Sequence, residues 1–177
     1  MEDCIVREIR HFGKVANLFV LASSLPHENS KNYTVENMFK RWSNYLMFNV
    51  LEHKGRPISF SGVYKYNDNL VRVVDRLFTI PEYRQMFMSK DIKEKIRPAA
   101  DYFIPYQTKW AKAKGYDCFF SIQTSKKRNS LKRLNKLVDD KLGYKVLPGL
   151  YKTSSNDITG WQNVSATNDI NLPKKED

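Results

Sequence analysis

The sequence predicts an α+β fold in which a mixed, mostly antiparallel sheet of about six or seven strands is flanked by about four helices. Two observations carry this prediction. Apolar residues recur at helical spacing in the early and late parts of the chain, whereas the middle changes to β-rich segments joined by short turns. The chain has 177 residues, 41% of them hydrophobic, which is enough for one substantial core. We therefore expect a single domain over residues 1–165 and a loose tail over 166–177.

The first half of the chain predicts a strand, two helices and then three antiparallel strands. Thr34 precedes apolar residues at helical spacing, so its hydroxyl can cap the second helix. The three strands follow one another across short polar turns, which favours antiparallel pairing. The expected strands cover residues 4–9, 45–52, 57–66 and 70–80, and the expected helices cover 12–22 and 35–42.

The second half of the chain predicts alternating helices and strands and then a final pair of strands. Pro98 suits the first position of a helix, and Gly115 is placed to end it. Leucines at helical spacing predict another helix that Gly143 ends. The expected strands cover residues 117–123, 144–152 and 158–164.

Charge and cysteine content restrict the partners and the compartment. Thirty Lys and Arg against nineteen acidic residues give a net charge of +11, which favours anionic partners such as phosphates or nucleic acid. Only Cys4 and Cys118 are present, and neither they nor the three histidines have metal-ligand spacing, so we expect a reduced, cytoplasmic protein without a metal site. The first residues lack the apolar run of a signal peptide, and no segment is long and apolar enough to cross a membrane. The sequence does not predict the oligomeric state.

The segment from Asp75 to Arg84, DRLFTIPEYR, resembles the central strand of the GNAT superfamily of acyl-CoA-dependent N-acyltransferases and the turn that follows it. The order of the predicted elements is similar to that of the family, and Leu142-Gly143-Tyr144 matches it more loosely. The resemblance covers about residues 4–165 and implies a divergent GNAT-like protein. It implies acetyl-CoA or another acyl-CoA as cosubstrate and an amine, not identified by the sequence, as acceptor.

The resemblance also assigns cofactor contacts. In the family the pantetheine arm pairs with the central strand like an additional strand, and the pyrophosphate binds amides at a helix start. By this resemblance the backbone of Leu77, Phe78 and Thr79 would hold the arm, and Arg84 would face the phosphates. Asn129 matches an asparagine that can bind the cofactor arm, and its alternative role is to cap a helix. The family's glycines are absent here, because the run QMFMS follows the arginine.

A second phosphate site is predicted at the helix that starts near Pro98. Lys95 and Arg97 would supply two cations, and Ala99 and Ala100 would place small side chains beside free backbone amides. The alternative is that both cations are solvated and that the alanines only pack.

The candidate catalytic residues follow from the chemistry of thioester aminolysis, in which the amine must lose a proton and strand amides can polarise the carbonyl. Asp75 occupies the position where many relatives carry a strand glutamate, which makes it the candidate base. The alternative is a structural aspartate paired with Arg72 or Arg76. The family's tyrosine acid is replaced by Asp139, and Tyr144 is the candidate substitute, with Tyr151 and Tyr106 as alternatives.

Two other functions stay open. The region from Lys109 to Lys152 carries twelve Lys or Arg and three acidic residues, so it could follow a nucleic-acid backbone. Trp110, Tyr116 and Phe119 could then stack on bases if they are exposed. The alternative is a solvated basic face. The remaining possibility is a non-catalytic GNAT-like domain that binds an acyl-CoA or a protein partner.

Overall fold

The structure is a computed structural model of the chain, and it describes residues 4–26, 30–83, 98–125, 145–151 and 158–165, with side chains up to residue 120. The chain divides into two compact units. The first contains residues 1–65 and 74–107, and the second contains residues 66–73 and 108–177. The single domain over residues 1–165 stays a prediction, and the predicted tail lies outside the described residues.

The first unit contains four antiparallel strands. Tight pairing between the second and third strands is possible because Lys54 and Gly55 turn the chain with φ values of 50° and 79°. The last two strands run antiparallel, since Ile58, Ser59 and Ser61 of the third strand bond to Ile80, Phe78 and Asp75, which follow in reverse order. The strands are β1 (Cys4–Glu8), β2 (Tyr45–His53), β3 (Arg56–Lys65) and β4 (Leu70–Thr79), and β4 belongs to this unit from Val74 onward.

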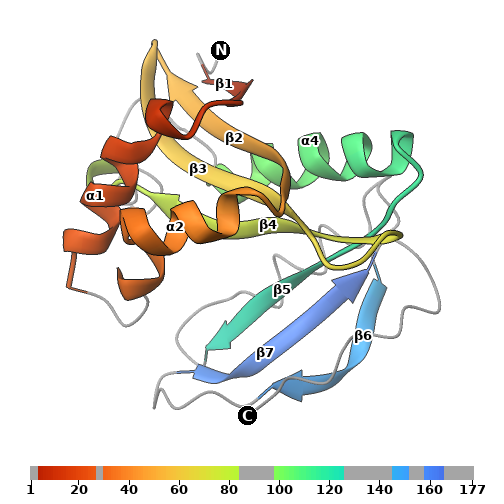
Figure 1. Ribbon diagram of the computed structural model, residues 1–177. Coiled ribbons are helices and arrows are strands. Elements are labelled where there is room, and N and C mark those ends of the chain that lie inside the picture. Colours follow the sequence, from red (N-terminus) through yellow and green to blue (C-terminus); the bar gives the residue numbers. More distant parts are fainter. Residues whose placement is uncertain (1–3, 27–29, 84–97, 126–144, 152–157, 166–177) are drawn as a thin grey trace. The chain divides into compact units, whose positions relative to one another are not determined.

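Helices cover both faces of this sheet. α1 and α2 lie on one face, and the first part of α4 lies on the other (Figure 1). The predicted cap of α2 is confirmed, because the Thr34 hydroxyl accepts a hydrogen bond of 3.2 Å from the Asn37 amide. The helical segments are η1 (Phe12–Lys14), α1 (Ala16–Ser24), η2 (Ser30–Tyr33), α2 (Val35–Trp42) and α4 (Ala99–Ala113).

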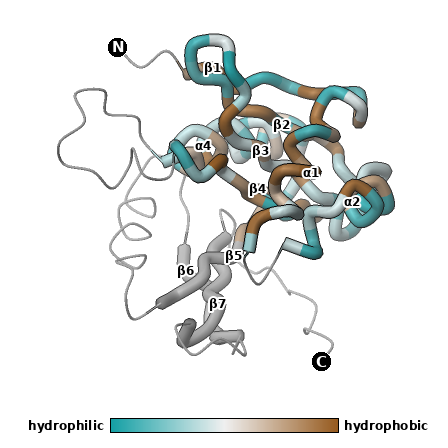
Figure 2. The backbone as a smooth tube through the Cα atoms, turned by 90° about the vertical axis from the view of Figure 1, so that its left-hand side faces the viewer, coloured by the Kyte–Doolittle hydropathy of each residue, from teal (hydrophilic) through white to brown (hydrophobic). Residues whose placement is uncertain are grey.

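Aromatic side chains form the core between α1, α2 and the sheet. The Phe19 ring of α1 meets the Phe60 ring of β3 at 4.9 Å, and Phe60 meets Phe78 of β4 at 5.4 Å. All three side chains are at most 1% exposed. Figure 2 colours parts of β2, β4 and α1 as hydrophobic. Aromatic packing therefore fixes the face of β4 that carries Phe78.

The second unit contains the start of β4 and three further strands. Leu70–Arg72 pair in parallel with Asp117–Phe119 of β5 (Asp117–Ser125). β7 (Ile158–Ser165) pairs antiparallel with both β5 and β6 (Lys145–Tyr151). Gly115 follows α4 with a φ of 81°, as expected for the residue after a helix.

The predicted fold class is confirmed. The strand order is β1-β2-β3-β4-β5-β7-β6, and the β4–β5 pair is parallel within an otherwise antiparallel arrangement. The helix predicted between β5 and β6 lies outside the described residues. None of the helices in the described ranges is long and apolar enough to cross a membrane.

Candidate active site

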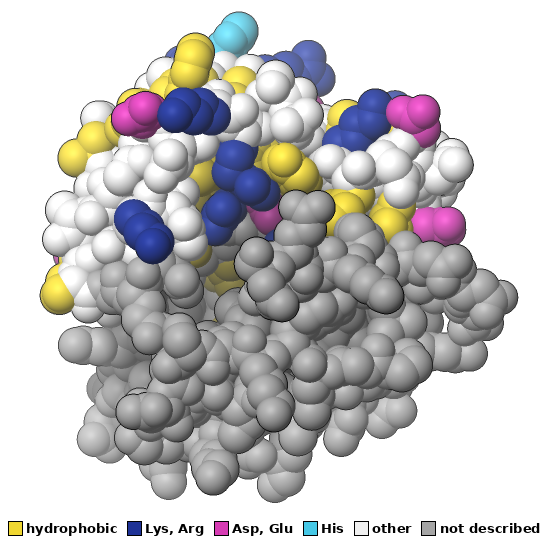
Figure 3. All heavy atoms as spheres, turned by 60° about the horizontal axis from the view of Figure 1, so that its bottom comes forward, with side chains coloured by type: hydrophobic (Ala, Val, Ile, Leu, Met, Phe, Trp, Pro, Cys, Tyr) yellow, Lys and Arg dark blue, Asp and Glu magenta, His cyan; other side chains and the backbone are white. Residues whose placement is uncertain are grey.

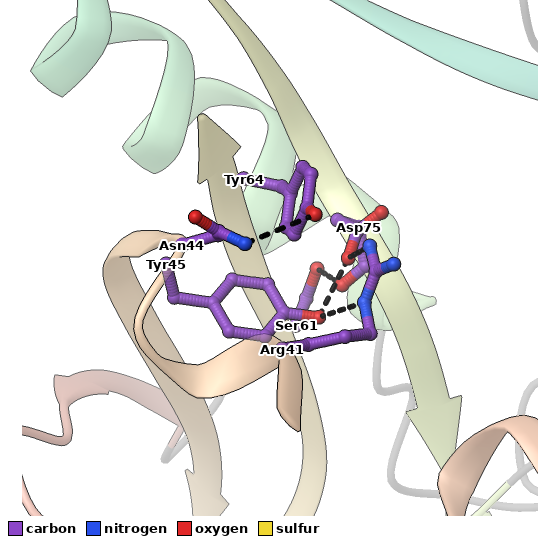
Figure 4. A network of polar contacts seen from close by, with 6 residues as sticks. All are labelled: Arg41, Asn44, Tyr45, Ser61, Tyr64 and Asp75. Atoms are coloured by element: carbon purple, nitrogen blue, oxygen red, sulfur yellow. Dashed lines mark hydrogen bonds and ion pairs between the residues drawn. The ribbon is translucent and has the colours of Figure 1, made fainter. Parts of the chain in front are cut away.

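Asp75 lies at the centre of a buried polar network on the α2 side of the sheet. Asp75 is 2% exposed. Its Oδ2 accepts hydrogen bonds from the Tyr45 hydroxyl at 2.6 Å and from Arg41 Nη2 at 2.8 Å. Figure 4 shows the three side chains converging from α2, β2 and β4. We call Arg41, Tyr45 and Asp75 the Asp75 network.

Local sequence explains how these residues meet. Arg41 lies in the last turn of α2, and Tyr45 opens β2 only four residues later. Gly62 of β3 leaves room for the phenol, because a Cβ there would lie within 2.4 Å of the Tyr45 ring. Ser61 adds a hydrogen bond of 3.3 Å from its hydroxyl to the Asp75 carbonyl. The helix–strand connection and one glycine therefore place both donors against the carboxylate.

Arg41 is also held by an aromatic ring. Its guanidinium carbon lies 4.1 Å from the centroid of the Tyr64 ring, a distance at which cation–π attraction is favourable. The Asn44 amide in turn donates to the Tyr64 hydroxyl at 3.4 Å (Figure 4). The Arg41 side chain is 24% exposed, so solvent reaches the network at this residue.

Electrostatics in the network keep the proton on Tyr45. Burial and then the nearby Asp75 carboxylate raise the pKa of the Tyr45 phenol well above its ordinary value of 10.0. Burial alone would lower the pKa of Arg41, but the charge of Asp75 and the hydrogen bond with Tyr45 outweigh it and raise that pKa. At neutral pH the network therefore holds one cation and a neutral phenol, both donating to one carboxylate.

The predicted cofactor strand is β4, and its peptide groups alternate in direction. The Phe78 carbonyl faces β3, since it accepts from the Ser59 hydroxyl at 2.5 Å. Leu77 and Thr79 therefore direct their backbone groups to the opposite edge. The Leu77 carbonyl accepts a hydrogen bond of 3.0 Å from the Tyr33 hydroxyl. Among the described strands of the first unit, β4 lies at the edge of the sheet, and Leu77 and Thr79 face away from β3.

The predicted phosphate site at the start of α4 lies only partly within the described residues. Ala99 is 3% exposed and opens the helix, followed by Ala100. Asp101 occupies the first turn of the helix, where a carboxylate interacts favourably with the free amides but would repel a phosphate. The other predicted cofactor and acid residues lie outside the described residues: Arg84, Lys95, Arg97, Asn129 and Tyr144.

Sequence reasoning missed the partners of Asp75. The ion pair comes from Arg41, 34 positions earlier in the chain, whereas the sequence suggested Arg72 or Arg76. It also missed Asn49 and Gln107, which are fully buried on the α4 side of the sheet. The available signal was a polar residue at an otherwise apolar position, which predicts a buried hydrogen bond but not its partner.

A pocket of about 430 Å³ lies elsewhere in the first unit, between α1 and the ends of β2 and β3. Leu18, Leu21 and Val50 give it apolar walls, and Lys14 and Arg56 contribute cations. No member of the Asp75 network lines it. The pocket and the network are therefore separate features.

The aromatic residues of the nucleic-acid hypothesis are not all available. Phe119 is 3% exposed, and the rings of Trp110 and Tyr116 stack on each other at 6.1 Å. Figure 3 shows Lys and Arg side chains in separate places on one face, with acidic side chains beside several of them. The described residues contain no group of three His, Cys, Asp or Glu side chains that could hold a metal ion.

Comparison with known proteins identifies the fold. No protein-family model matches the sequence, and no curated protein matches it. Among solved structures, the ribosomal-protein-S18-alanine N-acetyltransferase from Escherichia coli matches with a TM-score of 0.57 and 9% identity, covering 98% of this chain and 99% of that protein. The aminoglycoside 6'-N-acetyltransferase from Enterococcus faecium matches with a TM-score of 0.56 and 14% identity, covering 94% of this chain and 99% of that protein.

A third structure adds a ligand to the comparison. A GNAT family acetyltransferase from Elizabethkingia anophelis, with acetyl-CoA bound, has a TM-score of 0.55 and 10% identity, covering 93% of this chain and 98% of that protein. The chain therefore has the fold of the GNAT acetyltransferases, which confirms the predicted resemblance. At these identities the likeness concerns the fold.

Proposed function

We propose that the chain is an N-acyltransferase that transfers an acetyl group from acetyl-CoA to an amine. The observation that carries the proposal is the place of β4, which lies between β3 and β5 in the strand order and pairs in parallel with β5. The segment that resembles the GNAT central strand, residues 75–84, begins in this strand. We propose a cytoplasmic location on the same basis as before, the composition and cysteine content.

In this proposal the cofactor arm pairs with β4 along Leu77–Thr79. The alternation of peptide groups supports it, because Phe78 bonds toward β3 while Leu77 and Thr79 present their amides at the other edge. A thioester lying there would have strand amides within reach of its carbonyl, and hydrogen bonds to that oxygen stabilise the charge that develops when an amine attacks.

Calorimetry tests the cofactor proposal. Titration of the full chain with acetyl-CoA and with coenzyme A should show binding of both, with release of a free thiol when an amine acceptor is added. Absence of heat even at millimolar ligand would overturn the proposal. Binding without thiol release across a broad amine panel would instead support a non-catalytic acyl-CoA-binding domain. Salt-dependent retention of RNA or DNA without coenzyme A binding would support the nucleic-acid alternative.

The phosphate seat is proposed at the start of α4, with Lys95 and Arg97 as cations and Ala99 and Ala100 beside the free amides. Asp101 gives a sharp test, because its charge opposes a phosphate at this place. We expect Asp101→Asn to tighten coenzyme A binding several-fold while Asp68→Asn, an exposed change in a turn, leaves it unaltered. If Arg84→Ala weakens binding and Asp101→Asn does nothing, the seat lies after β4 and this placement is wrong.

Asp75 is the proposed base, with Tyr144 as the proposed acid and Asn129 as a further contact to the cofactor arm. Because Asp75 is 2% exposed, a base role needs a hydroxyl or a water molecule to carry the proton from the amine. Asp75→Asn should then abolish thiol release while coenzyme A binding persists. Unchanged turnover in a folded Asp75→Asn protein would remove Asp75 from the role of base.

A further inference from the structure

The backbone of β4 is irregular on both sides of Asp75. Val74 has a φ of 54° and Arg76 a φ of 56°, values that non-glycine residues rarely adopt. Val74 is the more unusual of the two, because its β-branched side chain crowds the backbone in this conformation. Such a conformation persists only when the surrounding structure holds it in place.

The positions of side chains show the consequence of this irregularity. Phe78 packs on Phe60 and Tyr33, on the face that α1 and α2 cover. Asp75 bonds to Arg41 of α2, so it faces the same side although it lies three positions from Phe78. In a regular strand, residues three apart face opposite sides. The alternation of β4 therefore breaks at the irregular stretch from Val74 to Arg76, which we call the bulge of β4.

A chain of buried amides on the opposite face holds the bulge. The Val74 amide donates to Gln107 Oε1 at 2.7 Å, and Gln107 Nε2 donates to Asn49 Oδ1 at 2.9 Å. Asn49 Nδ2 then donates to the Arg7 carbonyl at 3.4 Å. Gln107 and Asn49 both have an exposed fraction of zero. We call these two side chains the amide relay.

An amide side chain can do what Gln107 does here, whereas an apolar side chain cannot. It accepts from a backbone N–H with its oxygen and donates with its nitrogen, so it satisfies groups on two different strands at once. A leucine of similar size would leave the Val74 amide and the Asn49 oxygen buried without these partners, and buried polar groups are nearly always paired. The relay also connects α4 to both β2 and β4.

We infer that Gln107 and Asn49 are positioning residues, which hold the bulge of β4 and thereby turn the Asp75 carboxylate toward Arg41 and Tyr45. Their hydrogen bonds go to the Val74 amide, to each other and to the Arg7 carbonyl. They act through the backbone, because Gln107 binds the amide of Val74, the residue directly before Asp75. This inference does not depend on the proposed activity, since it concerns which side of the sheet Asp75 faces.

The test reads the surroundings of Tyr45 in the full chain, by pH titration of ¹³C-labelled tyrosines followed by NMR. In the unaltered protein the Tyr45 phenol should resist ionisation, because burial and then Asp75 raise its pKa. In Gln107→Leu the carboxylate should move away, and the Tyr45 pKa should fall by roughly one unit or more. Asn49→Leu should shift the Tyr45 titration in the same direction, because it removes the group to which Gln107 Nε2 donates.

Val15→Ala provides the control, since Val15 is 1% exposed in the core near α1 and its loss should lower stability without touching β4. Its Tyr45 titration should match that of the unaltered protein. A folded Gln107→Leu protein with an unchanged Tyr45 titration would overturn the inference. If Gln107→Leu does not fold, hydrogen exchange of the Val74 amide in the unaltered protein decides, because fast exchange there would contradict a held bulge.

An activity readout applies if the chain transfers acetyl groups, and this arm alone rests on the proposed function. Gln107→Leu should then lower kcat by about tenfold or more and leave KM for acetyl-CoA within about twofold, because it displaces Asp75 and not the cofactor strand. A rise in KM with kcat unaltered would contradict the positioning role. Failure of the activity arm with a shifted Tyr45 titration would count against the proposed function and not against the relay.

Discussion

The two faces of the sheet beside β4 hold polar groups of different kinds. On the α2 face, Arg41 and Asp75 form an ion pair that solvent reaches, since Arg41 is 24% exposed. On the α4 face, Gln107 and Asn49 form a neutral relay with no exposure. A neutral relay can bind backbone groups without the cost of removing a charge from water. An ion pair carries that cost, sets the local electrostatic potential and responds to pH. One face therefore fixes the geometry of the strand, and the other carries the charge.

The largest effect should come from breaking the charged face. Asp75→Asn leaves the Arg41 guanidinium facing a neutral amide, and because the pair is largely buried, removing its carboxylate should cost about 3 kcal/mol. Urea denaturation should show this loss in the free energy of unfolding. The double variant Asp75→Leu with Arg41→Met should be more stable than Asp75→Asn, and a double variant that is no better would contradict the desolvation argument.

A smaller effect should follow from filling the space beneath Tyr45. Gly62→Ala places a Cβ within 2.4 Å of the Tyr45 ring, so the ring must move and its bond to Asp75 weakens. We expect a loss of about 2 kcal/mol, as for other overpacked sites. Gly13→Ala is the matched control, because nothing lies within 4 Å of a Cβ there. Equal thermal stability of the two variants would show that Tyr45 is not held against β3.

The pH response should distinguish the two faces. The pKa of Tyr45 is raised in the folded state, so its stabilising effect is complete below the ordinary value of 10.0 and is lost as the pH rises above it. One such group lowers the free energy of unfolding by about 1.4 kcal/mol per pH unit. Tyr45→Phe should remove this part of the slope and cost about 1 kcal/mol at neutral pH. Denaturation at several alkaline pH values measures both, and an unchanged slope would contradict the role of Tyr45.

The smallest effect should come from an exposed ion pair on the same helix. Lys40 and Glu36 of α2 lie 3.1 Å apart with side chains 68% and 78% exposed. Glu36→Gln should change the free energy of unfolding by less than about 0.5 kcal/mol, because water already screens the pair. A loss comparable to that of Asp75→Asn would mean that charge on α2, and not burial, decides the stability of the α2 face.

Much of the fold could be predicted because it depends on local patterns. Thr34 marks the start of α2 and Gly115 the end of α4, since capping and positive φ restrict the residue at each place. The site could not be predicted in the same way. If side chains alternated regularly along the strand, Asp75 and Phe78 would face opposite sides of the sheet, which is wrong. No residue of the segment DRLFTI predicts the bulge. Arg41 and Gln107 reach β4 only through tertiary packing, and no sequence spacing encodes that contact.

The bulge in β4 makes the number of residues in this strand a functional property. Two residues separate Asp75 and Phe78, where one would suffice to keep both on the same face of a regular strand. We expect a single-residue deletion there to yield a flatter, regular ladder with the same hydrophobic core. The Val74 amide would return to that ladder and leave Gln107 without its partner. Deletions are usually tolerated in loops and harmful in strands, and here the harm would fall on the site more than on the fold.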